Sequence, residues 1–359
     1  MIPKSIDEVT DSWLSEVLGA TVTAHSAEQI GQGVGLMGDI FRVALDITDP
    51  EGAPASVVVK LPSSFEENRA QGVALGMFEA EVRFYRELAA QAPVGLPAVY
   101  SADIQPGTAD FVIVMEDLSQ LSLVGQSDGM SFDQAVAAVR VLAGIHAIWW
   151  NRVQTTELEW ILSMIGPRIE YVDQLLIDIL PTFSEGFGHC LPHDGLKLFE
   201  LFAGNYLKFN QTLAERSPWT LAHQDYRVEN LMFGPEGSGQ VIVLDWQGIG
   251  RGPGAYDLSY LLGGSMAIEL RREHEQELIR AYHDQLLVSG VTDYSLTALQ
   301  DDYGFAHLMG GLATAMVTGG TMDLSNARGL ALVETMAERH ITAALDHDGI
   351  ARAKHVLGR

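Results

Sequence analysis

The chain has 359 residues, of which 47% are hydrophobic and 19% are charged, so it can hold two hydrophobic cores and is not a disordered protein. Its 47 acidic and 22 basic residues give a formal charge of −25, which argues against a nucleic-acid partner, because nucleic acids are bound through Lys and Arg. One cysteine, an N-terminus without an apolar signal core and the lack of a long uncharged apolar run predict a cytoplasmic protein with no membrane span.

The first part of the chain is predicted to be rich in strands. Residues 6–18 have apolar side chains at helical spacing, which predicts an amphipathic helix. A glycine-rich stretch at 30–39 then precedes a strand of alternating apolar residues at 41–48. Backbone N–H groups in such a stretch can approach phosphates closely, although ordinary hairpins also use glycine. The glycines in question are Gly31, Gly33 and Gly35.

A lysine and a glutamate are expected to pair in this region. Lys60 lies near the end of the apolar strand 57–61, where a lysine is unusual unless it is paired or functional. A helix is predicted over 76–90, and Glu81 lies within its apolar stripe. Burying an unpaired carboxylate is unfavourable, so we predict that Glu81 pairs with Lys60 and holds it against ATP phosphates. The alternative is that Glu81 lies at the edge of the stripe, in water.

The buried strand 111–115 is expected to end the first lobe. It leads into Glu116 and Leu118, which we predict to form a hinge between two lobes. The first lobe would comprise residues 1–117 and the second residues 118–359. The position of this segment predicts that its backbone meets the adenine edge of a nucleotide. The residues expected to do so are Met115, Glu116 and Leu118.

The rest of the chain is predicted to be mainly helical. Ser131–Gln134 has the pattern of a capping box and opens a helix whose apolar stripe includes His146, predicted to be a hydrogen-bonded core histidine. Asp257 begins another helix and is expected to cap amides or to brace the loop that contains Asp225. Residues 309–322 predict a packed helix in which Gly319 and Gly320 mark a break.

Polar residues in the middle of the chain predict a phosphotransfer site. Two short apolar runs separated by a Gly/Pro/Ser cluster indicate a hairpin, at whose open end Asn230 and Asp245 would meet. Amide and carboxylate oxygens suit Mg²⁺. In kinases an Asp accepts the hydroxyl proton and an Asn five residues later holds metal, a spacing that Asp225 and Asn230 match. The alternative is a polar turn in which these side chains cap backbone amides.

Together these segments resemble the aminoglycoside phosphotransferase superfamily, and most closely its ecdysteroid-kinase-like (CHK) branch of small-molecule kinases. Two residues depart from the family pattern: Gln224 stands where glycine is usual, and Trp246 where Phe is common. The matching segments are Glu81–Tyr85, Met115–Leu118, Leu142–Trp149, His223–Phe233, Asp245–Gln247 and Asp257–Tyr260.

The resemblance implies an α+β, protein-kinase-like fold with a small antiparallel-sheet N-lobe and a larger, mainly helical C-lobe. It implies Asp225 as catalytic base, Asn230 and Asp245 as Mg²⁺ ligands, and Lys60, braced by Glu81, on the phosphates of ATP. The expected reaction moves the γ-phosphate of MgATP to a hydroxyl of a small molecule, such as a bulky alcohol of aminoglycoside, choline or sterol type.

The sequence also bears on three alternative functions. A protein kinase is disfavoured by His-Gln-Asp in place of His-Arg-Asp and by the short interval from Asp245 to Asp257, which leaves no room for a long activation loop. A catalytically silent nucleotide-binding protein would be expected to have lost a site residue. A kinase of a hydroxyacyl thioester differs only in its acceptor and stays open. Tryptophans and aliphatic residues within 119–220 favour a bulky, largely apolar acceptor with at most one positive charge, and the alternative is that these aromatic residues simply belong to the hydrophobic core. The oligomeric state is left open.

Overall fold

The chain forms two compact units. The computed structural model describes residues 2–31, 37–48, 52–92, 95–321 and 327–359, so Gly33 and Gly35 of the predicted phosphate-binding stretch lie outside the described residues. The first unit comprises Met1–Leu121 with Ile242–Gly248, and the second comprises Ser122–Val241 with Ile249–Arg359. Each unit has a hydrophobic core of its own. A short segment from the middle of the chain therefore belongs to the first unit.

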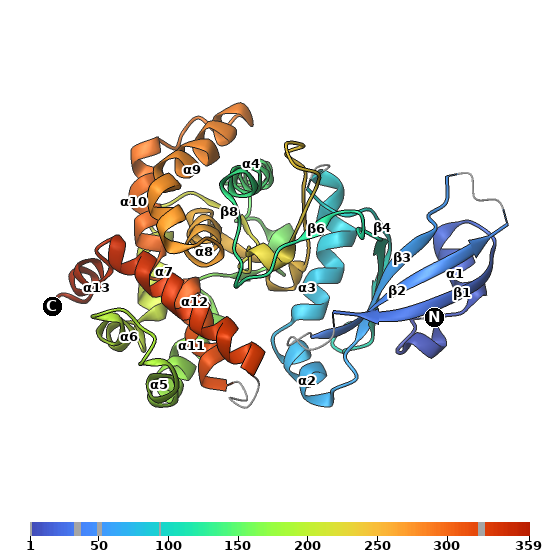
Figure 1. Ribbon diagram of the computed structural model, residues 1–359, viewed down its shortest axis with the longest axis horizontal. Helices are drawn as coiled ribbons and strands as arrows, with labels where there is room; N and C mark the ends of the chain where they lie inside the picture. Colours follow the sequence, from blue (N-terminus) through green and yellow to red (C-terminus); the bar gives the residue numbers. More distant parts are fainter. Residues whose placement is uncertain (1, 32–36, 49–51, 93–94, 322–326) are drawn as a thin grey trace. The chain divides into compact units, whose positions relative to one another are not determined.

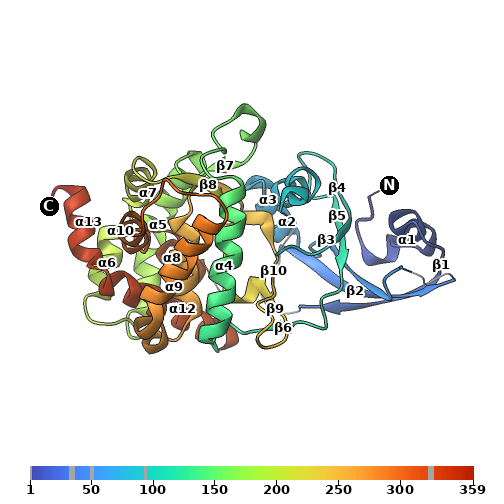
Figure 2. The same ribbon diagram turned by 90° about the horizontal axis from the view of Figure 1, so that it is seen from above.

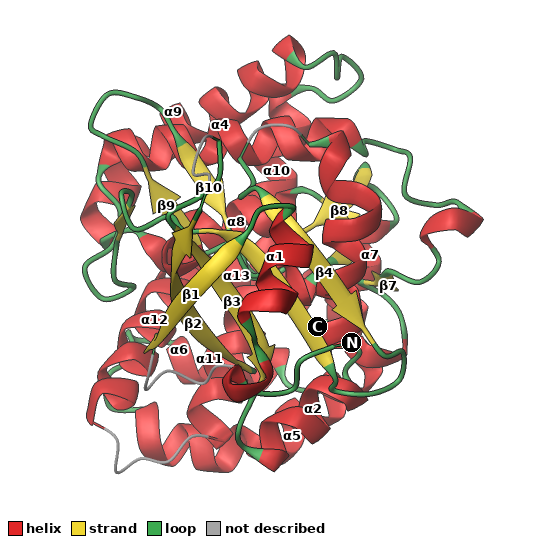
Figure 3. Ribbon diagram, turned by 90° about the vertical axis from the view of Figure 1, so that its right-hand side faces the viewer, coloured by secondary structure: helices red, strands yellow, loops and turns green. Residues whose placement is uncertain are grey.

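An antiparallel sheet forms the centre of the first unit. Within the described residues it has five strands in the order β1-β2-β3-β5-β4 (Figure 3). Helices α1 and α3 pack against it (Figure 1). The elements are α1 (Asp11–Leu18), β1 (Val22–Ile30), β2 (Gly38–Ile47), β3 (Ser56–Pro62), α2 (Glu66–Ala74), α3 (Met77–Arg83), β4 (Val99–Ile104) and β5 (Phe111–Glu116).

The two faces of this sheet explain the position of Lys60. Its neighbours on either side in β3 are buried in the core that α1 covers, so the period of two directs Lys60 to the other face. There Lys60 pairs in register with Ile113 of β5. Two residues earlier in β5, Phe111 stacks on Phe78 of α3, with ring centroids 4.8 Å apart. Lys60 therefore lies on the face that α3 covers.

Two predicted helices of the first unit are not single, continuous α-helices. The helix predicted over 6–18 is divided into a 3-10 turn, Ile6–Glu8, and α1, because extended Thr10 caps α1 by accepting a hydrogen bond from the Trp13 N–H (3.2 Å). The helix predicted over 76–90 is α-helical only as far as Arg83 and continues as a π-helical turn, Phe84–Leu88. Such turns in α-helices are frequent at functional sites.

The second unit is mainly helical (Figure 2). Its short strands are β6 (Ser122–Leu123), which pairs with β9 (Leu231–Phe233), and β7 (Leu162–Ser163), β11 (Gly250–Pro253) and β8 (Trp219–Ala222), which pair in that order. Its helices are α4 (Phe132–Ile148), α5 (Pro167–Phe187), α6 (Gly195–Phe202), α7 (Tyr206–Ala214), α8 (Ala255–Ser265), α9 (Ile268–Val288), α10 (Leu296–Ala306), α11 (Gly310–Thr321), α12 (Ala327–Asp346) and α13 (Gly349–Leu357). Among the described helices none is long and apolar enough to cross a membrane.

Helix α8 lies at the centre of this unit. Every residue of α8 is buried, and α4, α9, α10, α11 and α12 pack around it. The predicted capping box of α4 is present, since Ser131 and Gln134 exchange two hydrogen bonds of 3.0 and 3.3 Å. A turn closes after β9, where the Gly234 N–H donates to the Gln240 carbonyl (3.0 Å). Beyond this turn, β10 (Val241–Val243) leads into the segment that joins the first unit.

The predicted helix break at Gly319 and Gly320 is wrong. Helix α11 continues through both residues to Thr321. A Cβ atom at Gly319 would lie 2.8 Å from the ring of Phe183, and one at Gly320 would lie 2.7 Å from Ile179. These glycines therefore permit close packing of α11 against α5 and do not end the helix.

A buried histidine lies among glycines next to α8. His340 of α12 is 2% exposed, and Cβ atoms at Gly264 and Gly311 would come within 2.4 and 2.2 Å of its ring. Burial, together with Arg339 and Arg271, lowers the pKa of His340 from 6.5 to about 3. Because unfolding restores the ordinary pKa, the unfolded chain binds an extra proton between those two values, and stability falls as the pH is lowered through this window.

We therefore predict that His340→Gln makes stability less dependent on pH. Between pH 6.5 and pH 5, His340 alone should remove about 2 kcal/mol of unfolding free energy from the wild-type protein, and the variant should lack this decrease. Urea unfolding at both pH values measures the slope independently of any uniform destabilisation by the substitution. Equal slopes in the two proteins would show that His340 does not titrate in this way.

Candidate active site

A buried ion cluster in the first unit consists of Lys60, Glu81 and Asp245, and we call it the lysine cluster. Lys60 Nζ donates to Glu81 Oε2 (2.7 Å), to Glu81 Oε1 (3.0 Å) and to Asp245 Oδ1 (3.1 Å). Lys60 is 7% exposed and Glu81 1%. The predicted pairing of Lys60 with Glu81 is thus confirmed. Asp245 is a second partner of Lys60 that the sequence analysis did not identify.

The charges of the lysine cluster are unequal. Burial by itself would lower the pKa of Lys60, but the carboxylates of Asp245 and Glu81 outweigh it and raise the pKa, so the ammonium stays protonated. Burial raises the pKa of Glu81, and nearby Asp245 adds to this against the opposing effect of Lys60. When all three groups are ionised, two carboxylates share one ammonium. The cluster thus has excess negative charge and oxygen ligands of the kind that Mg²⁺ prefers.

Local packing holds Asp245 in place. Its backbone has a positive φ of 63°, which is uncommon for a residue other than glycine. The next residue, Trp246, stacks on Phe84 of the π-helical turn with ring centroids 3.9 Å apart. Gln247 Nε2 donates to Asp245 Oδ2 (3.1 Å), and the Val243 N–H donates to the Gly95 carbonyl (2.8 Å). These contacts attach the segment Ile242–Gly248 to the first unit.

A polar loop in the second unit, residues 223–230, contains Asp225, and we call it the aspartate loop. Tyr260 donates its hydroxyl to Asp225 Oδ1 (2.9 Å), and Asn230 Nδ2 donates to Asp225 Oδ2 (2.8 Å). Arg227 Nε lies 3.4 Å from Asp225 Oδ1. The sequence analysis assigned no role to Tyr260 or Arg227. Because Tyr260 lies one helical turn after Asp257 on α8, the spacing of these two residues was a usable signal.

Asp257 fixes the start of the aspartate loop, as predicted. Its carboxylate accepts hydrogen bonds from the backbone N–H groups of His223 (2.6 Å) and Gln224 (2.8 Å). His146 Nε2 lies 3.1 Å from Asp257 Oδ2, and His146 Nδ1 lies 2.7 Å from the Tyr282 hydroxyl. The prediction that His146 is a hydrogen-bonded core histidine is also confirmed.

The orientation of Asn230 leaves its amide oxygen for a cation. Its Nδ2 donates both to the Asp225 carbonyl (2.9 Å) and to the Asp225 carboxylate. The amide oxygen is a hard ligand and fits Mg²⁺. Asn230 belongs to the second unit and Asp245 to the first. Their expected meeting at the open end of the hairpin stays a prediction.

The predicted nucleotide-binding residues lie on the sheet and at its end. Gly31 follows β1 with a positive φ of 72°. Met115 pairs with Val58 in the sheet, and the Glu116 N–H donates to the Ala98 carbonyl (2.8 Å). The carbonyl of buried Leu118 accepts from the Leu121 N–H (2.8 Å). These contacts fix the backbone path after β5, and the roles of these residues stay predictions.

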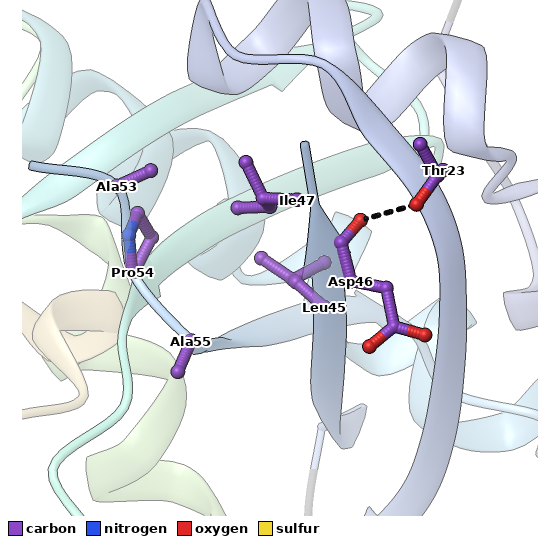
Figure 4. A pocket seen from close by; sticks show the side chains of 7 residues that line it. All are labelled: Thr23, Leu45, Asp46, Ile47, Ala53, Pro54 and Ala55. Atoms are coloured by element: carbon purple, nitrogen blue, oxygen red, sulfur yellow. Dashed lines mark hydrogen bonds between the residues drawn. The ribbon is translucent and has the colours of Figure 1, made fainter. Parts of the chain in front are cut away.

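A small pocket of the first unit contains none of the predicted site residues (Figure 4). Short aliphatic side chains line most of it, including those of Leu45 and Ile47. Lys60 pairs in register with Ile40, several residues away from them along β2. This pocket is therefore separate from the lysine cluster.

In a further group of possible metal ligands, the carboxylate already accepts hydrogen bonds from neighbouring donors. Glu275, His307 and His347 place ligand atoms within 4.8 Å of one another. However, Glu275 Oε1 accepts from Arg271 Nη1 (2.7 Å) and from the Tyr303 hydroxyl (2.7 Å), and His347 Nε2 lies 2.9 Å from Glu275 Oε2. An arginine and a histidine beside the carboxylate favour an ion-pair network over a bound cation.

The chain matches the model of one protein family. The model of the ecdysteroid kinase-like family matches residues 32–289. No curated protein sequence matches the chain.

Solved structures of small-molecule kinases have the same fold. A protein from Ralstonia eutropha assigned as an aminoglycoside phosphotransferase has a TM-score of 0.55 at 17% identity, with 94% of this chain and 97% of that chain covered. Choline kinase from Cryptosporidium parvum has a TM-score of 0.54 at 11% identity, and the match covers 98% of this chain and 93% of the choline kinase chain. Amicoumacin kinase, solved in complex with AMP-PNP, Ca²⁺ and Ami, has a TM-score of 0.52 at 16% identity, and the match covers 88% of each chain.

We predict that Lys60 and Glu81 are energetically coupled. Lys60→Met leaves two carboxylates without their shared ammonium and should lower the unfolding free energy by about 3–5 kcal/mol. Glu81→Met in the same protein should recover much of this loss, because the pair is then replaced by apolar groups. Urea unfolding of the two single variants and the double variant measures the coupling.

The control is the exposed pair Arg83–Glu87, one helical turn apart, where Nε lies 2.8 Å from Oε1. The same double-variant cycle at this pair should give a coupling below about 1 kcal/mol. Losses at Lys60 and Glu81 that simply add would contradict the proposed interdependence.

Proposed function

Because the chain belongs to the ecdysteroid kinase-like family, we propose that it transfers the γ-phosphate of MgATP to a hydroxyl group of a small molecule. The single observation that carries this proposal is the position of Asp225, whose two carboxylate oxygens are held by Tyr260 and Asn230. The family and the fold support a small-molecule kinase, and the complex of amicoumacin kinase with AMP-PNP supports an adenine nucleotide as phosphate donor.

The lysine cluster is proposed to bind the phosphates of ATP. Lys60 would contact them, and Glu81 would keep the ammonium oriented, as the buried ion pair suggests. Gly31, Gly33 and Gly35 are proposed to cover the phosphates, and Met115, Glu116 and Leu118 to contact adenine. Asp245 and Asn230 would hold Mg²⁺, which supplies charge neutralisation at the phosphate oxygens when it is bound.

Asp225 is proposed to act as the base. The acceptor hydroxyl would donate its proton to a carboxylate oxygen of Asp225 while its own oxygen attacks the γ-phosphorus, and the bond from this phosphorus to the β,γ-bridging oxygen would break, so that ADP leaves with the bridging oxygen. Two neutral donors, Tyr260 and Asn230, restrict rotation of the carboxylate without neutralising its charge. In phosphoryl transfer such positioning supplies a large part of the catalysis.

A silent nucleotide-binding protein is the weaker alternative. Lys60, Asp225, Asn230 and Asp245 are all present, and the first of these lies in a fully formed ion cluster. An alcohol of aminoglycoside, choline or sterol type, or a hydroxyacyl thioester, is a candidate acceptor within this proposal.

We predict that Asp225→Asn removes phosphotransfer and leaves nucleotide binding nearly intact. The substitution preserves the size of the side chain but removes the proton acceptor, so turnover should fall by about 10²–10⁴-fold. ADP release with a panel of aminoglycosides, choline-like amines, sterols and hydroxyacyl thioesters first identifies an acceptor for the wild-type protein. Calorimetry with MgATP then compares binding in the two proteins.

The matched control is Asp284→Asn, which removes one exposed carboxylate from α9. It should retain wild-type turnover. Full turnover by Asp225→Asn with the same acceptor would remove Asp225 from the mechanism.

A further inference from the structure

A mainly buried arginine lies beside the aspartate loop without a carboxylate partner. Arg168 is in the first turn of α5, and within the described residues no carboxylate lies at ion-pair distance from it. Arg168 Nη2 donates a hydrogen bond to Gln224 Oε1 (2.6 Å). Gln224 is the residue before Asp225. Burial lowers the pKa of Arg168, and the nearby side chains of Tyr256 and Tyr206 oppose this.

Such an arginine differs from the others around the loop. A guanidinium has five N–H donors, is always charged in proteins, and is normally paired when it is removed from water. Arg227 meets this expectation, because it pairs with Glu229 and lies near Asp225. Arg168 has a neutral amide oxygen as its partner and keeps partial access to solvent. It therefore offers positive charge and further donors to a ligand.

Gln224, which accepts the hydrogen bond from Arg168, has a strained backbone and a tightly packed side chain. Its backbone has a positive φ of 66°, a conformation that costs a residue other than glycine about 1–2 kcal/mol. Its Nε2 is buried and has no hydrogen-bond partner among the described residues. A Cβ atom at Gly250 would lie 1.6 Å from this nitrogen, so β11 must have glycine there to admit the amide. Strain and an unsatisfied donor at one residue are typical of binding sites.

We propose that Arg168, oriented by the amide oxygen of Gln224, binds an anionic group, a carboxylate or a phosphate, on the acceptor whose hydroxyl is presented to Asp225. This inference rests on the proposed kinase function. The acceptor is then an anionic alcohol, because the same molecule must present an anionic group to Arg168 and a hydroxyl to Asp225. It replaces our expectation of a positively charged acceptor, since a cation would be repelled by the guanidinium.

Ligand-observed NMR without nucleotide tests anion binding directly. The probes are 3-hydroxybutyrate and glycerol 3-phosphate, with their neutral counterparts 1,3-butanediol and glycerol, and choline as the cation. The wild-type protein should bind at least one anionic probe, and the preferred probe distinguishes carboxylate from phosphate. Arg168→Gln should weaken that binding by about 10- to 100-fold, and Arg168→Lys should recover part of it. Arg140→Gln, an exposed arginine on α4, removes the same charge and should leave binding unchanged.

Two results would overturn the proposal: equal binding of anionic and neutral probes, or equal binding of the anions by the wild-type protein and Arg168→Gln. A merely structural role of Arg168 would weaken all probes alike, which the neutral alcohols detect. Failure of kinase function is separate, because it appears as lack of MgATP binding in calorimetry. Binding of MgATP without any preference for anionic probes would leave the kinase standing and reject the anionic acceptor.

Discussion

The first unit is organised around one constraint: the buried ammonium of Lys60 must be paired with carboxylates. Lys60 is directed by the strand period to the face of the sheet that α3 covers, where water is excluded. Glu81 comes from α3, and Asp245 comes from a segment distant in sequence. One charge thus joins three elements. Removing Lys60 leaves two uncompensated carboxylates in a poorly solvated place, which is more unfavourable than the loss of one contact.

In the second unit, too, a buried charged group is paired with hydrogen-bonding partners. The buried carboxylate of Asp257 accepts hydrogen bonds from two backbone N–H groups of the aspartate loop and contacts His146. Helix α8, which contains Asp257, therefore fixes the start of this loop. Asp225 itself is held at both oxygens. Arg168 differs from Arg227 beside the same loop, because its partner is a neutral amide oxygen and not a carboxylate. A charged group with a neutral partner next to the proposed base is the observation from which we infer an anionic ligand.

Sequence patterns predicted what depends on periodicity and local hydrogen bonding. The alternation of β3 and the apolar stripe around Glu81 were sufficient to predict the pairing with Lys60, and the capping box predicted the start of α4. Contacts between distant segments were not predictable from spacing, which is why the Lys60–Asp245 ion pair was missed. Gly319 and Gly320 were misread because a packing glycine and a helix-ending glycine look alike until the neighbouring helix is known.

The most direct test of the central claim is an ATP titration by calorimetry, with Mg²⁺ or with EDTA, in the wild-type protein and in Asp245→Asn. The account predicts that wild-type binding depends on Mg²⁺ and that the substitution weakens binding in Mg²⁺ by at least about tenfold. Asp46→Asn, at the pocket in Figure 4, is the matched control and should bind as the wild-type protein does. Equal affinity and equal Mg²⁺ dependence in the wild-type protein and Asp245→Asn would contradict the account.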